Sequence, residues 1–409
     1  MQVSRRVLLG SAAALSTLPV LRARAQAKPR IKLGVLTDLS GTYRDNTGPN
    51  SVACTHQAVE EFNPASHGLD VEVISADHQN KPDIASSLAR QWCDQGVDAI
   101  IDVPTSSVAL AVAQVVKEKD KIMLNGSATT TDLTDAQCSP NTIVWSFDTY
   151  MMAQSQGGST VKAGGKSWYF ITADYVFGHI LEEQTAALVE KAGGKVLGKL
   201  RYPFPDTTDF SSYLQQAQAS GAQVLGLANA GLDTVNSIKQ AHEFWLNQTM
   251  KICPLLIFIT DVHSLGLDTA QGLTCTTSFY WNHDDRTRAF TRRVQPKLSN
   301  GAYPNMAHAS CYSATLHYLK AVAAMGGAAA IKSGRETVAK MKSMPTDDDA
   351  FGKGSIRADG RGVFPAYQWR VKKPSESKMA WDVFDPVLTS PPAEVLHPLS
   401  DKCKFPTTA

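Results

Sequence analysis

The feature that most constrains the fold is a regular alternation of short apolar runs with amphipathic stretches. In the first half of the chain, the apolar runs predict strands and the amphipathic stretches predict helices. The strands are expected at 31–38, 69–77, 98–104 and 121–124, and the helices at 49–63, 81–96 and 106–120. Short apolar strands that alternate with helices are typical of a parallel sheet covered on both faces.

The alternation restarts further along the chain, although no sequence repeat of fixed period is present. Strands are expected at 167–174, 195–203, 222–230, 251–261 and 272–281, and helices at 178–194, 209–219 and 233–246. The Pro-rich tail over 362–387 reads as a closing β segment. One α/β scheme used twice predicts two similar lobes, and a chain of 409 residues is long enough to form both.

The N-terminus has the pattern of an export signal. Arg5 and Arg6 precede an apolar run, and small residues then offer cleavage after Ala25 or Ala27. We therefore expect a signal peptide over 1–25, because its apolar run is too short to span a membrane comfortably. The paired arginines also fit a twin-arginine signal, and they leave Sec export open.

The apparent basicity of the chain belongs to this signal. Removing residues 1–25 removes four arginines and no acid, so the mature chain has 36 basic and 38 acidic residues. No later stretch reads as a transmembrane helix. A nearly neutral chain lacks the basic surface that nucleic-acid binding needs, so we expect no nucleic-acid partner. We also expect export to the periplasm, from the signal peptide, and a monomeric state.

Seven cysteines are scattered along the chain without a CxxC pair, which argues against a zinc ribbon or a thioredoxin motif. Export permits disulfides, and an odd number leaves at least one cysteine without an internal partner. Cys253 and Cys275 lie on successive predicted strands and are the first expected bridge. Cys54 with Cys93, on successive predicted helices, is the second. Buried free thiols are the alternative.

Small polar residues follow the predicted strands in both halves of the chain. They form six loops, at 37–43, 104–107, 125–131, 172–175, 229–231 and 260–261. Ligands of open parallel sheets bind outside the carboxyl ends of the strands, so these loops would line a cleft if the two lobes face each other. Hydroxyls and helix N-termini suit a small carboxylate. Helix capping is the commoner explanation for any single loop, but six loops in one register favour binding.

On this interpretation, the run "NGSATTTDLT" over 125–134 has a binding part and a part that starts the next helix. Ser127, Ala128 and Thr129 follow the fourth strand directly and are predicted to bind the ligand. Thr131 and Asp132 are predicted to start the next helix.

Motifs for catalysis are missing from the sequence. It contains neither G-x-S-x-G nor G-x-G-x-x-G, and "GGKS" at 164–167 lacks the P-loop glycine because position 160 is Thr. "HEFWL" at 242–246 lacks the second histidine of H-E-x-x-H. We therefore expect no enzyme activity, no metal and no cofactor.

Six aromatic residues fall at or near the predicted strand ends: Trp145, Tyr150, Tyr175, Phe177, Tyr280 and Trp281. Core packing explains most such residues. Two or three near the crossover between the lobes would instead wall an apolar ligand pocket.

Five segments together resemble the periplasmic substrate-binding proteins of ABC transporters, in the branch typified by the leucine/isoleucine/valine-binding protein. They are "IKLGVLTDLSG", "GVDAIIDVPTSSVALAV", "IMLNGSATTTDLT", "ITADYVFG" and "YSATLHYLKAVAAMGG", and the resemblance runs from about residue 30 to the tail. It implies an α/β fold of two Rossmann-like lobes with central parallel sheets, joined by a multi-segment hinge (the type I periplasmic binding fold). By resemblance, one lobe holds 30–147 and 282–355, and the other holds 148–281 and 356–409.

The resemblance also implies roles for residues at matching positions. Ser106 would bind the ligand carboxylate, and Ser127, Ala128 and Thr129 would supply backbone groups and hydroxyls. Phe177 stands where amino-acid binders often have Tyr. The remaining predicted contacts are Tyr43, Tyr150, Tyr175, Asn229 and Asp261, of which Asp261 is the nearest candidate to hold an ammonium group.

The resulting hypothesis is a solute receptor that closes over a small hydrophobic carboxylate and delivers it to ABC permease subunits. The ligand is either a branched-chain or similar amino acid, or an aromatic or other hydrophobic acid. Phe177 favours an acid without an ammonium group. The alternatives are a ligand-sensing regulatory protein on the same fold and, third, an exported enzyme.

Overall fold

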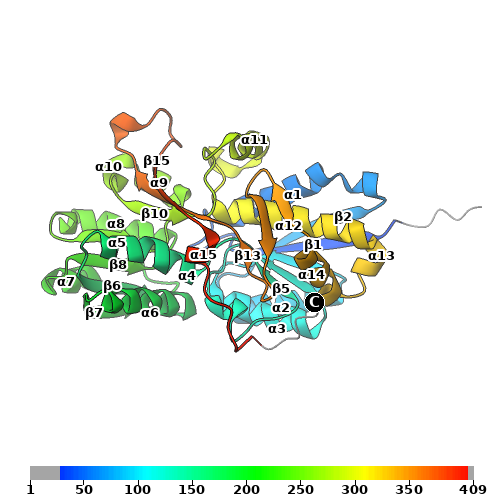
Figure 1. Cartoon of the computed structure of the whole chain (residues 1–409), viewed down its shortest axis with the longest axis horizontal. Coiled ribbons are helices and arrows are strands. Elements are labelled where there is room, and N and C mark those ends of the chain that lie inside the picture. The colour runs from blue at the N-terminus through cyan, green and yellow to red at the C-terminus, as the bar shows by residue number, and fades with distance from the viewer. Residues whose placement is uncertain (1–27, 404–409) are drawn as a thin grey trace, which may run out of the picture.

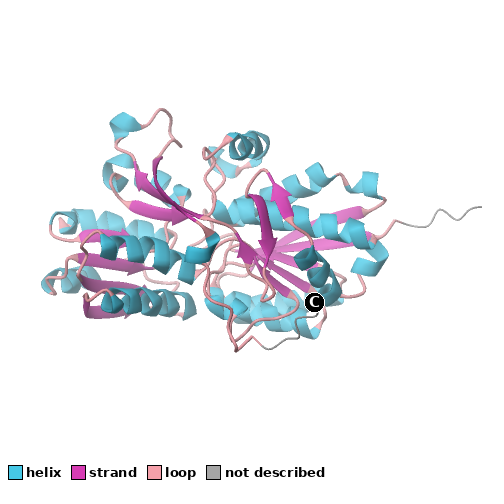
Figure 2. Ribbon diagram, in the orientation of Figure 1, coloured by secondary structure: helices cyan, strands magenta, loops and turns pink. Residues whose placement is uncertain are grey.

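The computed structural model describes residues 28–403, so the expected signal peptide lies outside the described part of the chain. Two α/β lobes lie side by side, and several chain segments pass between them (Figure 1). Each lobe has a central parallel sheet with helices on both faces, which confirms the expected fold class (Figure 2). Within residues 28–403, none of the helices is both long and apolar enough to cross a membrane.

The first lobe, on the right in Figure 1, is built on a five-stranded parallel sheet in the order β2-β1-β3-β4-β5. Its strands are β1 Arg30–Thr37, β2 Asp70–Asp77, β3 Ala99–Asp102, β4 Ile122–Asn125 and β5 Thr142–Val144. Its helices are α1 Gly48–Phe62, α2 Pro82–Asp94, α3 Ser106–Glu118, α11 Asp285–Val294, α12 Met306–Met325, α13 Gly327–Ala330 and α14 Gly334–Ser343. Short 3-10 turns cover Pro64–His67, Thr131–Thr134, Gln295–Lys297 and Ser299–Gly301.

The apolar runs form central strands because both of their faces are buried. Ala99 and Ile101 of β3 pack into one core with α1 and α12, whereas Ile100 packs into a second core with α2 and α3. The four residues of β3 are all buried, and so are the four of β4. Strands of this kind read as continuous apolar runs rather than as alternating ones, which is the pattern seen in the sequence.

The second lobe has a four-stranded parallel sheet in the order β7-β6-β8-β9. Its strands are β6 Ser167–Ala173, β7 Lys195–Tyr202, β8 Val224–Ala228 and β9 Lys251–Pro254. Its helices are α4 Thr149–Met152, a π-helical turn Ala153–Gly157, α5 Gly158–Lys162, α6 Val176–Lys191, α7 Ser211–Ala219, α8 Leu232–Glu243, a 3-10 turn Leu246–Gln248, α9 Ile259–Leu265 and α10 Leu267–Ala270.

The strand expected at 251–261 is too long. β9 ends at Pro254, and α9 begins at Ile259. The reason is a local helix start signal: the Asp261 carboxylate accepts the backbone N–H of Phe258 at 2.9 Å. An acid in the first turn that satisfies a free N–H in this way stabilises a helix N-terminus.

A separate antiparallel sheet joins β10 Thr274–Thr277, β14 Ala366–Val371 and β15 Phe384–Ser390. The closing β segment is therefore confirmed, while β10 does not extend the parallel sheet. A three-stranded antiparallel sheet of β11 Thr346–Asp348, β12 Gly352–Ile356 and β13 Gly362–Val363 precedes β14. β12 spans the expected boundary at 355/356, and the exact lobe boundaries stay a prediction. The remaining elements are a 3-10 turn Pro374–Glu376 and α15 Pro392–Val395.

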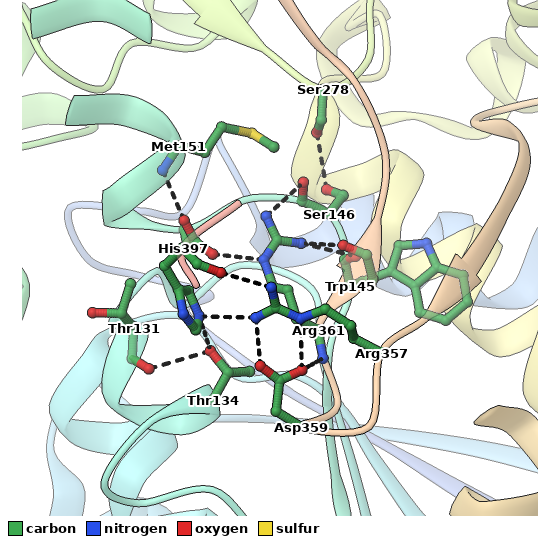
Figure 3. Close-up of polar contacts among 12 residues, drawn as sticks. Thr131, Thr134, Trp145, Ser146, Met151, Ser278, Arg357, Asp359, Arg361 and His397 are labelled. Carbon is green, nitrogen blue, oxygen red and sulfur yellow. Dashed lines mark hydrogen bonds and ion pairs between the residues drawn. The ribbon is translucent and has the colours of Figure 1, made fainter. Parts of the chain in front are cut away.

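The segments that pass between the lobes meet at the buried side chain of Arg361. Its Nε donates to the Asp148 carboxylate at 2.6 Å, and its Nη atoms donate to the carbonyl oxygens of Trp145, Ser146 and Gly362 at 3.3, 3.3 and 2.8 Å (Figure 3). Arg361 and Asp148 are both fully buried. One guanidinium group therefore ties together two of the connections.

The third connection joins the same cluster through a hydroxyl contact. The Ser278 hydroxyl, which follows β10, donates to the Ser146 hydroxyl at 2.9 Å. The Ser310 hydroxyl of α12 lies 2.7 Å from Ser146 as well. The hinge is thus a packed polar cluster rather than a set of independent strands.

The tail leaves α15 and returns to the first lobe. Cys403 forms a disulfide with Cys138, with the two Cα atoms 5.6 Å apart. The Nε2 atom of His397 lies 2.8 Å from the Thr134 hydroxyl (Figure 3). The backbone carbonyl oxygen of His397 accepts a hydrogen bond from the Arg357 guanidinium group at 2.6 Å. His397 and Cys403 are therefore held beside the segment that follows "NGSATT", in the first lobe.

Both expected disulfides are wrong. Cys253, Cys275, Cys54 and Cys93 are free and buried. Cys253 lies on β9 and Cys275 on β10, which belong to different sheets, and the Cys253 thiol instead contacts the Thr160 hydroxyl at 3.5 Å. Succession along the chain does not bring two strands together when a strand changes sheet.

Candidate functional site

A cavity of about 340 Å³, including its mouth, lies between the lobes. Nine first-lobe residues line it: Tyr43, Asn46, Thr47, Pro104, Thr105, Ser106, Ser127, Ala128 and Thr129. Five second-lobe residues complete the lining: Tyr175, Phe177, Ala230, Leu256 and Phe258. These residues follow the carboxyl ends of parallel strands, as expected for a doubly wound sheet. The volume suits a small molecule.

The cavity is polar without being charged. None of the described residues that line it is Asp, Glu, Lys, Arg or His. Four helices of at least twelve residues begin at its wall, namely α1, α3, α6 and α8. Helix N-termini present free N–H groups and a partial positive charge, so the cavity suits an anion although no basic side chain lines it.

The loop after β3 has a strained backbone. Asp102, Val103 and Thr105 have φ values of 78°, 58° and 74°, a region that β-branched residues rarely adopt. The Thr105 hydroxyl donates to the amide oxygen of Asn80 at 2.5 Å, which helps to hold this conformation. The result is that α3 begins at Ser106, directly against the cavity.

The opening loop after β1 is shaped by a buried carboxylate. Asp38 accepts the backbone N–H groups of Gly41 at 2.6 Å and Tyr43 at 2.9 Å, and the Asn80 amide at 2.7 Å. This arrangement directs Tyr43 into the cavity wall. Asp38 and Asn80 were not among the predicted site residues. An Asp three residues before Gly is a recognisable turn signal in retrospect.

The segment "NGSATTTDLT" folds back on its own first residue. The Asn125 amide oxygen accepts the N–H of Ala128 at 2.9 Å, and the Asn125 amide donates to the Ala128 carbonyl at 2.6 Å. The N–H of Thr130 donates to the Ser106 hydroxyl at 3.2 Å, which joins this segment to α3. A 3-10 turn begins at Thr131, so the predicted helix start at Thr131 and Asp132 is confirmed, while the predicted binding role of Ser127, Ala128 and Thr129 stays a prediction.

Two hydroxyls of this segment differ in their partners. The Ser127 hydroxyl contacts the Asp102 carboxylate beneath the cavity. The Thr129 hydroxyl forms no hydrogen bond with any other residue between 28 and 403, although Thr129 lines the cavity and is 3% exposed. Thr129 is therefore the hydroxyl that is most available to a ligand.

An aromatic wall crosses from one lobe to the other. The hydroxyls of Tyr43 and Tyr175 lie 2.6 Å apart, and Phe204 stacks on both rings at centroid distances of 5.5 and 4.4 Å. Burial raises the pKa of both tyrosines, so both hydroxyls stay protonated. Phe177 packs beside Tyr175 at 5.7 Å. This wall gives the cavity its apolar side.

Three of the predicted contacts do not line the cavity. Tyr150 packs edge-on against His397, and Asn229 is bonded to the hydroxyls of Thr234 and Ser237. The Asp261 carboxylate accepts the N–H of Phe258 at its own helix start and the amide of Asn46 at 3.4 Å, and burial raises its pKa to about 7. The other seven predicted residues come together at the cavity surface. Their role in binding stays a prediction.

Several lining residues were missed by the sequence interpretation. Leu256 and Phe258 were expected in the strand at 251–261, and Asn46 lies just beyond the polar loop expected at 37–43. Phe204, which stacks on the aromatic wall, lies in the "PFP" turn after β7. The sequence signal that could have identified these residues is their position after the carboxyl end of a predicted strand.

The fold and the cavity between the lobes define a two-lobed binding protein. Within residues 28–403 no group of three or more His, Cys, Asp or Glu could hold a metal ion. The cavity lining described above also contains no side chain that would serve as a general base for a serine or threonine nucleophile.

The sequence profile of the family described as periplasmic binding protein matches residues 30–377, and the chain belongs to that family. Leu/Ile/Val-binding protein homolog 6 of Brucella melitensis is 25% identical over 77% of this chain and 82% of the relative. A periplasmic binding protein from Burkholderia mallei is 44% identical, with a TM-score of 0.86 over 90% of this chain and 96% of that chain.

A third relative carries a transporter assignment. The periplasmic ligand-binding protein of a branched-chain amino acid ABC transporter from Burkholderia xenovorans LB400 is 37% identical. Its TM-score is 0.79, over 91% of this chain and 100% of that chain. These relatives confirm the family resemblance found in the sequence.

Proposed function

We propose that this protein is the solute receptor of an ABC importer, which closes over a small hydrophobic carboxylate and delivers it to a membrane permease. The observation that carries the proposal is an uncharged cavity at which four helix N-termini meet beside the free hydroxyl of Thr129. Such a site binds an anion through oriented dipoles and hydrogen bonds. Export to the periplasm, removal of residues 1–25 and a monomeric state belong to the same proposal.

The ligand class follows from what the lining offers. Two of the relatives are named for branched-chain amino acids, and an amino acid brings an ammonium group that needs a carboxylate or several acceptors. The nearest acid proposed for that role, Asp261, accepts the N–H of Phe258 and does not line the cavity. An aromatic or aliphatic acid without an ammonium group therefore fits better.

Closure is supported by contacts that cross from one lobe to the other. The Leu232 N–H donates to the Thr42 carbonyl at 3.1 Å, and the Thr260 hydroxyl donates to the Asn46 amide oxygen at 2.5 Å. A Cβ atom at Gly231 would lie 2.5 Å from the Thr42 oxygen, so only glycine allows this approach. Hinge closure around a ligand is the mechanism that such two-lobed proteins use.

The function is tested by a thermal-shift screen of the mature protein. We expect benzoate and branched aliphatic acids to raise Tm, because a ligand at about 100 times its Kd adds about 2.7 kcal/mol of apparent stability. L-Leucine, a sugar and a short peptide serve as comparisons. If a sugar or a peptide stabilises the protein and no acid does, the carboxylate proposal is wrong.

Replacing Thr129 with valine is expected to weaken binding of the stabilising acid by about 1–3 kcal/mol, because the ligand carboxylate loses a donor in a buried site. Isothermal titration calorimetry measures this change. Thr389→Val on the exposed face of β15 is the matched control and should bind like the wild type. Unchanged affinity in Thr129→Val would remove Thr129 from the site.

Replacing Asp261 with asparagine distinguishes the two ligand classes. We expect the affinity for benzoate to change by less than about tenfold, or about 1.4 kcal/mol, because the asparagine oxygen still accepts the Phe258 N–H. A receptor that uses Asp261 to hold an ammonium group would instead lose L-leucine binding in calorimetry. That outcome would assign an amino acid as the ligand.

A further inference from the structure

Asp102 lies at the end of β3, directly beneath the cavity, and is fully buried. Its Oδ2 accepts the Thr37 hydroxyl at 2.7 Å, and its Oδ1 contacts the hydroxyl of Ser127, which lines the cavity. No salt bridge within residues 28–403 involves Asp102. The carboxyl group therefore sits one hydroxyl away from the place where the ligand carboxylate is proposed to bind.

The proton positions around Asp102 are constrained by the partners of each hydroxyl. The Thr37 oxygen accepts the N–H of Gly48 at 2.9 Å, and within residues 28–403 the acceptor that its hydroxyl meets is Oδ2 of Asp102, so the Thr37 proton points there. Oδ1, facing Ser127, is then the oxygen that is free to carry a proton. Ser127 has one proton of its own, which goes either to Asp102 or into the cavity.

An ionised Asp102 conflicts with a carboxylate ligand. The Ser127 proton would point to Oδ1, and the Ser127 lone pairs would face the ligand's oxygen atoms. A second negative charge would also lie buried nearby without a cation, which is costly. A proton on Oδ1 removes both problems, because Asp102 then donates to Ser127 and Ser127 donates into the cavity.

The groups around Asp102 favour the neutral acid. The titratable side chains that face it are the thiols of Cys54 on α1 and Cys311 on α12, and burial raises the pKa of both, so they stay neutral. Burial also raises the pKa of Asp102 itself, against the opposing effect of its hydrogen bonds with Ser127, Thr37, Ser51 and Cys311.

We propose that Asp102 is a positioning residue that carries a proton on Oδ1 in the closed receptor and thereby makes Ser127 a hydrogen-bond donor to the ligand carboxylate. Ligand binding is then coupled to protonation at Asp102, and the receptor favours acids over ligands that present a donor at this point. This inference rests on the carboxylate function proposed above.

The first test is the pH dependence of benzoate affinity, measured by calorimetry between about pH 5 and about pH 9. Wild-type affinity should fall with rising pH, by up to about tenfold per pH unit once Asp102 has to take up a proton. Asp102→Asn should remove this dependence, because the amide always donates to Ser127 and still accepts from Thr37. Ser127→Ala should bind more weakly and keep part of the pH dependence, because a buried charge on Asp102 would still oppose the ligand carboxylate.

Asp348 provides a matched control. It is a buried carboxyl group of β11 that accepts the Ser313 hydroxyl at 2.5 Å, it does not line the cavity, and burial raises its pKa. Asp348→Asn should keep the pH profile of the wild type. A profile that changes equally in Asp348→Asn and Asp102→Asn would mean that general stability, not Asp102, controls binding, and it would overturn the proposal.

Infrared difference spectroscopy of wild type against Asp102→Asn reads the protonation state directly, with and without benzoate. We expect the carbonyl band of a protonated carboxyl group in the wild type, absent from the variant. A carboxylate signal alone at every pH overturns the proposal, as does a pH profile of Asp102→Asn that matches the wild type. Failure of the proposed function is distinguishable from failure of this inference, because neither benzoate nor L-leucine would then bind. The infrared comparison of the unliganded protein would still decide the protonation state of Asp102.

Discussion

Replacing Arg361 with methionine is expected to lower the free energy of unfolding by about 3–5 kcal/mol. Within residues 28–403, Arg361 supplies the guanidinium group that pairs with the buried Asp148 carboxylate, so the substitution leaves that charge in the interior without a cationic partner. It also removes donors from the carbonyl oxygens of Trp145, Ser146 and Gly362. Buried acceptors that lose a donor add to the cost.

The measurement is urea unfolding followed by tryptophan fluorescence. The double variant Arg361→Met with Asp148→Asn should recover part of the loss, because the buried charge is then gone while the asparagine oxygen still accepts the N–H of Met151. Arg90→Met is the control, since Arg90 pairs with Glu118 on the surface, where each side chain is at least half exposed, and its loss should cost far less than that of Arg361. Equal effects of Arg361→Met and Arg90→Met would contradict a structural role for the buried pair.

Arg361 also bears on ligand binding, because it joins the connections between the lobes. A variant that folds but has a loosened hinge should bind the ligand more weakly even though Arg361 does not line the cavity. The population of the closed form sets the apparent affinity in such a receptor.

Removing the Cys138–Cys403 disulfide in a Cys138→Ser, Cys403→Ser variant is expected to lower stability by about 2–5 kcal/mol. The bridge joins residues 265 positions apart and so restricts the unfolded chain strongly. It also holds the tail against the first lobe, where the Ser400 hydroxyl contacts Asp135 and His397 contacts Thr134.

The disulfide prediction is measured as Tm with and without a reducing agent. Reduction should lower the Tm of the wild type to that of the double variant and leave the double variant unchanged. Cys253→Ser is the control, because Cys253 is a free thiol, and this variant should keep its sensitivity to reduction. A wild-type Tm that reduction does not alter would show that the bridge contributes nothing to stability.

Much of the fold was predictable because its causes are local. The apolar runs at β3 and β4 and the helix that starts at Ser106 depend on residues within a few positions of each other. The end of β9 was missed although its cause is also local. The apolar run continues to Ile259, but α9 begins at that residue and Asp261 in its first turn accepts the N–H of Phe258. A short apolar run does not by itself distinguish a strand from a buried helix turn.

The candidate site likewise has residues that the sequence placed correctly and others that it did not. Ser106 and Thr129 follow strands directly, so their position at the cavity was expected from the topology of a parallel sheet. Asp261 also follows a strand, but its carboxylate accepts the backbone N–H of Phe258 at the start of its own helix. Sequence position places a side chain near an edge, whereas hydrogen-bond partners decide which way it faces.

The sequence by itself determined the two α/β lobes, the family and the loops that meet at the cavity, because periodicity and strand-end polarity are short-range properties. Only the tertiary structure decided the hinge cluster of Arg361 and Asp148, the Cys138–Cys403 bridge and the proton position inferred for Asp102. Arg361 and Asp148 lie 213 positions apart, and the two cysteines 265. Such pairings depend on how the whole chain packs, and no local pattern encodes them.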